Sequence, residues 1–163
     1  MKKIILICSK ELGTYLSSPM AYIVSAFFIG LSGASFTTYL AQSSYSDTSI
    51  RGFLETAQFL ILLFSALLTM RLISEERKLG TWELLLTAPV QDYEIVLGKF
   101  FSSLIILAGM LIMTLYFPVL LMIFGDPDTG PILTSYLGLI LIGSASLAIG
   151  IFSSSLTTNQ IVS

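Results

Sequence analysis

RLISEERKLGTWELLLTAPVQDYEIVLGK, residues 71–99, is the stretch around which the chain is organised, because it separates two long hydrophobic runs. It holds four of the chain's eight basic residues and five of its ten acidic ones. Such a polar insert must lie in water or at the membrane surface, since charged side chains are costly in hydrocarbon. What this insert contacts is therefore the central question about function.

The insert has the pattern of a short amphipathic helix between two breaks. Gly80 is suited to end a helix, since glycine tolerates the left-handed conformation, and Thr81 can cap a new one. Trp82 and Leu85 fall on one face of that helix, and Pro89 ends it after about two turns. Such a helix could instead only anchor the loop, with its indole at the headgroup level. Both interpretations stay open on the residues alone.

The composition is that of an integral membrane protein. The 163 residues are 55% hydrophobic and 11% charged, with a mean hydropathy of +0.89. Soluble domains are about 45–50% apolar and about 25% charged. The chain has no histidine and one cysteine, which excludes a disulfide within it, a histidine metal site and a histidine general base.

Four hydrophobic runs are long enough to cross a bilayer, which takes about 20 apolar residues. The sequence therefore predicts an all-α integral membrane protein with a single transmembrane domain over residues 1–163. Its predicted segments are an N-terminal interfacial amphipathic helix at 2–17, spans at 20–41, 54–73, 95–124 and 132–155, the polar insert at 74–94, and a polar stretch at 156–163.

Individual residues near the span ends carry more specific expectations. Asp92 can cap the helix that enters the third span, with Glu94 in its first turn. Lys99 is expected to reach back to the interface, and Pro118 to kink the third span. Glu55 stands at the entrance of the second span, within reach of the headgroups, so we do not take it for an intramembrane functional carboxylate.

Small residues on the first and fourth spans are candidates for helix packing. In lipid, small residues four apart let two helices approach closely. The candidates are Gly30 and Ala34 on the first span, and Gly143, Ser144, Ala148 and Gly150 on the fourth. For the first span, mere tolerance of glycine in membrane helices is an equally open interpretation.

The basic residues predict the orientation of the chain. Seven of the eight precede the first span or lie between the second and third, and Arg51 is the exception. The excess of Lys and Arg on cytoplasmic loops then places the N-terminus and the polar insert in the cytoplasm. We expect a multi-pass protein of the cell (inner) membrane.

The sequence holds no signature of catalysis. It has no G-x-x-x-x-G-K-[ST] nucleotide loop, no nucleophile elbow and no H-E-x-x-H. The predicted spans show no paired carboxylates for a proton relay. We therefore expect a protein that is not an enzyme, and any energy for work must come from a partner.

Three stretches resemble the ABC-2 type permeases, the membrane subunits of ATP-binding-cassette transporters. The run EERKLGTWELLLTAPVQDYEIVLGKF (75–100) looks like their cytoplasmic loop. KELGTYLSSPMAY (10–22) is similar to their N-terminal elbow, and SSLTTNQIVS (154–163) resembles the entry into their fifth span. The gliding-motility-type permeases are the most similar subgroup. Because the family has six spans, we expect a chain truncated after four, with 156–163 as the start of a missing fifth.

The resemblance implies a transport function and a set of partners. The chain would be the permease subunit of an ATP-driven exporter, with residues 74–94 as a coupling region that contacts a separate ATPase subunit. ATP and Mg would be bound by that partner and no cofactor by this chain. A second permease subunit, the same or different, and the lipid bilayer complete the partners, and no nucleic acid is expected. The implied coupling residues are Glu75, Glu76, Arg77, Gly80, Thr81, Trp82, Glu83, Leu85 and Pro89.

A four-span structural or assembly protein without an ATPase partner is the alternative. In that case the insert is only an anchor, and the small-residue faces are the functional surfaces. A solvated helix end is an equally open interpretation of Glu76 and Arg77.

Overall fold

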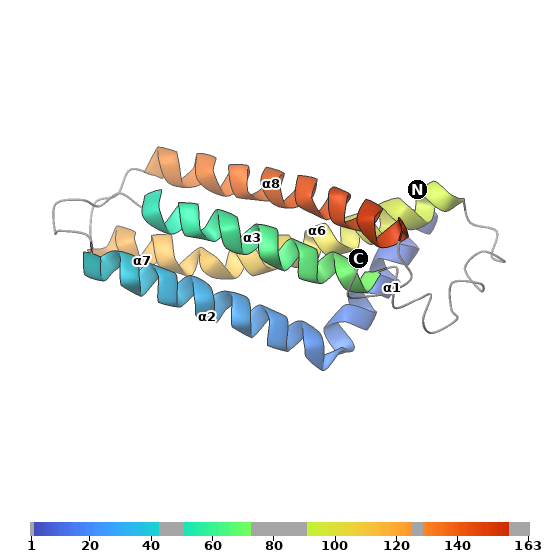
Figure 1. Cartoon of the computed structure of the whole chain (residues 1–163), viewed down its shortest axis with the longest axis horizontal. Coiled ribbons are helices and arrows are strands. Elements are labelled where there is room, and N and C mark those ends of the chain that lie inside the picture. Colours follow the sequence, from blue (N-terminus) through green and yellow to red (C-terminus); the bar gives the residue numbers. More distant parts are fainter. Residues whose placement is uncertain (1, 43–50, 73–90, 125–128, 157–163) are drawn as a thin grey trace.

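The computed structural model describes residues 2–42, 51–72, 91–124 and 129–156 (Figure 1). These residues form helices and no strand, which confirms the all-α prediction. The helices are α1 (Lys2–Ser17), α2 (Pro19–Gln42), α3 (Arg51–Leu72), α6 (Asp92–Thr114), α7 (Tyr116–Phe124) and α8 (Thr129–Leu156).

The long helices run side by side as a bundle, and α1 lies at one end of it, beside the start of α6 (Figure 1). Within the part of the chain that the structure describes, four segments are long and apolar enough to cross a membrane, which confirms the prediction of four spans. They are Ala21–Ala41, Phe53–Met70, Tyr93–Phe124 and Thr129–Ser155.

Three of the spans meet near their midpoints. A Cβ atom at Gly143 would lie 2.8 Å from Leu107 Cδ2 and 3.2 Å from Ile61 Cγ2, so α8, α6 and α3 meet there. Each of these residues is close to the midpoint of its own span. The midpoints of these three spans therefore lie at one level, and the position of another residue along its helix follows from the helical rise of about 1.5 Å per residue.

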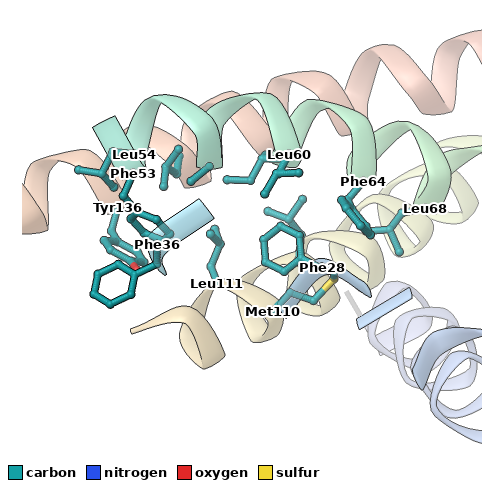
Figure 2. Packing of buried hydrophobic residues seen from close by; sticks show 14 of the residues in the cluster. Phe28, Phe36, Phe53, Leu54, Leu60, Phe64, Leu68, Met110, Leu111 and Tyr136 are labelled. Atoms are coloured by element: carbon teal, nitrogen blue, oxygen red, sulfur yellow. The ribbon is translucent and has the colours of Figure 1, made fainter. Parts of the chain in front are cut away.

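The buried core follows α3, which contributes side chains at every turn toward its neighbours (Figure 2). Near one end, the rings of Phe36 and Phe53 meet edge to face with centroids 5.6 Å apart. The ring of Phe117 lies 4.9 Å from that of Phe36 and 5.6 Å from that of Phe53. Aromatic pairs of this kind add about 0.5–1.5 kcal/mol beyond their buried area. They hold α2, α3 and α7 together.

The third span is interrupted at Leu115, between α6 and α7. The cause is Pro118, which has no N–H to donate to the carbonyl of Thr114 four residues earlier. The hydroxyl of Tyr136, on α8, donates to that carbonyl at 3.1 Å instead. The break expected from the proline is therefore present, and a side chain from another helix satisfies the carbonyl.

Candidate functional site

The nine predicted coupling residues, Glu75 to Pro89, fall within 73–90 and lie outside the described residues. The structure describes what adjoins them, namely the start of α6 and the helix α1 packed against it. We call this region the α1–α6 junction.

The first turn of α6 is stabilised by an acidic side chain. Gln91 occupies the N-cap position, with φ −86° and ψ 145°, and Asp92 is the first helical residue rather than the cap. The backbone N–H of Gln91 donates to Glu94 Oε2 at 3.2 Å. A carboxylate here also suits the positive end of the helix dipole. The sequence placed this helix start one residue late.

Lys99 is the central residue of the junction. Its side chain is 1% exposed, and its ammonium donates to Glu11 Oε1 of α1 at 3.2 Å. The expectation that Lys99 reaches back to the interface is therefore wrong. A buried ammonium is tolerable when a carboxylate lies within hydrogen-bond distance. Glu11 of α1 provides that carboxylate.

A second charged contact lies nearer the start of α6. Lys3 Nζ is 4.0 Å from Glu94 Oε2, with side chains 52% and 10% exposed. Water screens so exposed a lysine, so this contact adds little energy. Together with the Glu11–Lys99 pair, it shows that α1 and α6 run in the same direction where they pack.

The backbones of α1 and α6 approach closely between these two ion pairs. A Cβ atom at Gly98 would lie 2.9 Å from Ile7 Cβ and 3.4 Å from the carbonyl oxygen of Ile4, so only glycine fits there without displacing α1. Cys8 is buried in α1. Burial raises the pKa of its thiol, and the negative charge of Glu11 raises it further.

The amphipathic stripe predicted for α1 is divided between two environments. Cys8 is buried, whereas Ile5 and Leu16 are 66% and 58% exposed. One side of α1 is therefore packed against protein, and these two side chains are left for lipid or another surface.

The predicted packing residues also fall into two groups. Gly143 lies against Leu107 and Ile61, and a Cβ at Gly150 would lie 2.8 Å from Thr69 Cβ, so both glycines let α8 approach its neighbours. Gly30 has no atom within 4 Å of its Cβ position. Ala34 and Ala148 are exposed. Ser144 is half-buried, and its hydroxyl donates to the carbonyl of Leu141 in its own helix at 2.8 Å.

The Glu11–Lys99 pair is the feature that sequence reasoning missed. Both residues stand in the stretches that resemble the permeases, but as separate motifs. Nothing in either stretch says that they touch, because 88 residues separate them. Among the described residues, no group of three His, Cys, Asp or Glu side chains could hold a metal ion.

Comparison with known protein families matches residues 5–163 to the ABC-2 family transporter proteins. No curated protein matches the chain. The family match spans nearly the whole sequence and includes both halves of the α1–α6 junction as well as the four apolar helices. The chain therefore belongs to the ABC-2 transporter family and is a multi-pass membrane protein of the permease type.

Proposed function

We propose that this chain couples ATP hydrolysis by a separate ATPase subunit to the movement of a substrate across the cell (inner) membrane. The observation that carries the proposal is the family match over residues 5–163. ATP and Mg belong to the partner subunit in this proposal. A second permease subunit completes the assembly, and the proposed direction is export.

The charge distribution supports a cytoplasmic N-terminus and insert. Seven of the eight basic residues precede the first span or lie between the second and third, and the positive-inside rule favours the cytoplasm for such segments. The α1–α6 junction then lies on the same side as residues 74–94. Because that region continues α3 and leads into α6, a force applied to it by an ATPase would reach these two helices directly and α1 through Lys99 and Glu11. Such a force would bias the spans between two arrangements.

Co-purification tests the proposal directly. The tagged chain is isolated from gently solubilised source membranes, and the proteins that accompany it are identified by mass spectrometry. We expect a soluble protein with a G-x-x-x-x-G-K-[ST] nucleotide loop among them. Gly80→Trp and Glu83→Lys should remove it while the helical content of the chain is unchanged.

Gly130→Trp is the matched control, because Gly130 lies in the first turn of α8, at the opposite end of the bundle, and its Cβ position is open. It should leave co-purification intact. If no ATPase accompanies the wild-type chain, the structural or assembly role gains support instead. If an ATPase accompanies the wild-type chain and both insert variants alike, residues 74–94 are not the contact.

A further inference from the structure

A groove of about 300 Å³ lies between α3 and α8, away from the α1–α6 junction. Three polar side chains line it, those of Glu55, Gln58 and Ser135, beside an apolar wall that includes Leu139. Gly138 leaves the groove open, since no atom lies within 4 Å of its Cβ position. The groove thus combines a carboxylate, a carboxamide and a hydroxyl with apolar surface.

The groove lies near one end of the second span. Glu55 is the third residue of the segment Phe53–Met70 and is exposed, so it stays at the entrance of the span, as expected from the sequence. Lipid headgroups begin where the hydrocarbon ends, so a side chain at this position is within their reach. The groove can therefore meet a headgroup with its polar side chains and an acyl chain with its apolar wall.

The polar side chains of the groove have no partner in the part of the chain that the structure describes. No hydrogen bond or ion pair joins Glu55, Gln58 or Ser135 to another described residue. Elsewhere on α8, the hydroxyls of Ser144 and Ser146 donate to carbonyls of their own helix. The side chains of the groove are therefore available to a ligand.

We propose that this groove binds the primary ammonium headgroup of a membrane lipid, with phosphatidylethanolamine as the occupant. A carboxylate facing lipid needs a cation, and an ammonium offers three N–H donors to the oxygens of Glu55, Gln58 and Ser135. An acyl chain then lies along Leu139 and Ile142. A trimethylammonium headgroup lacks the donors, and a glycerol headgroup lacks the cation. The site is independent of any ATPase partner.

Native mass spectrometry of the full-length chain tests the proposal. The protein is purified in a mild nonionic detergent and mixed with phosphatidylethanolamine, phosphatidylcholine or phosphatidylglycerol that carry the same acyl chains. Wild type should retain phosphatidylethanolamine about tenfold better than the other two, the scale of one charge-assisted bond. The isosteric Glu55→Gln should abolish this preference.

Two glycine variants separate the groove from the general surface. Gly138→Leu fills the groove without removing its charge and should lower retention of phosphatidylethanolamine. Gly109→Leu, at another open glycine on α6, should not. Dodecylamine, which carries the ammonium without a phosphate, should displace the lipid.

Three results would overturn the assignment. They are equal retention of the three lipids by wild type, an unchanged preference in Glu55→Gln, and failure of dodecylamine to compete. The last would show that the phosphate is recognised rather than the ammonium.

Discussion

At the scale of single residues, the two members of the Glu11–Lys99 pair are not equally replaceable. Lys99 is 1% exposed and Glu11 17% exposed. Removing the carboxylate leaves an ammonium enclosed by protein, whereas removing the ammonium leaves a carboxylate with some access to water. Breaking a buried pair from one side costs about 3–5 kcal/mol because of the charge that remains.

We therefore expect Glu11→Gln to lower the free energy of unfolding by about 3 kcal/mol and Lys99→Met to lower it less. The control is Lys10→Gln, an exposed neighbour, which should change it by no more than about 0.5 kcal/mol. Denaturant unfolding in mixed micelles measures all three. Equal losses of unfolding free energy in Glu11→Gln and Lys99→Met would contradict the expected difference between the two residues.

Cys8 offers a native probe of the same junction. Since burial and then Glu11 raise the pKa of its thiol, less of the reactive thiolate exists at neutral pH. Alkylation should be slow at neutral pH, and its rate should keep rising past the ordinary cysteine pKa of about 8.5. The comparison is Ser9→Cys in a Cys8→Ser background, because Ser9 is the exposed neighbour. Equal alkylation rates at the two positions would show that α1 does not stay docked on α6.

At the scale of elements, the break between α6 and α7 depends on two helices. Pro118 removes a donor from the third span, and Tyr136 supplies one from the fourth at 3.1 Å. The same hydroxyl lies 3.2 Å from Thr114 Oγ1. The interruption is therefore anchored to α8 through hydrogen bonds as well as through packing.

A double-mutant cycle tests whether the Tyr136 hydroxyl takes the place of the N–H that Pro118 lacks, as the donor to the carbonyl of Thr114. Tyr136→Phe should cost about 1 kcal/mol of unfolding free energy, the net value of one hydrogen bond. In a Pro118→Ala background the new backbone N–H can reach the carbonyl of Thr114, so the cost should fall toward zero. Additive effects of the two variants would mean that the tyrosine does not replace the missing donor.

At the scale of the whole molecule, the contact of Gly143 with Leu107 and Ile61 places the spans at a common level. Nitroxide labels on exposed residues near that level should therefore be equally deep in the bilayer. Suitable positions are Leu62, Ile105 and Leu141, each substituted by cysteine in a Cys8→Ser background.

A label at Leu133 should be shallower than one at Leu141 by about 12 Å, the rise of eight helical residues. The ratio of oxygen to nickel-chelate accessibility by electron paramagnetic resonance measures these depths. Unequal depths at the three central positions would contradict a common level for the midpoints of these spans.

The sequence was sufficient for the four spans and the break at Pro118, because hydropathy and a missing N–H are local properties. It was not sufficient for the surroundings of Lys99, whose carboxylate comes from a segment 88 residues away. Nor was the sequence sufficient for the way the helices align, because that alignment depends on contacts between distant residues such as Gly143 with Ile61.

The order of synthesis determines which half of the α1–α6 junction is made first. At about 5–20 residues per second, a ribosome completes Lys99 about 4–18 s after Glu11. The newly synthesised α1 therefore reaches the membrane before α6, the helix that packs against it, has been made. When α6 is inserted, Lys99 meets Glu11, which is already in place. Insertion of the third span therefore completes the packing of α1.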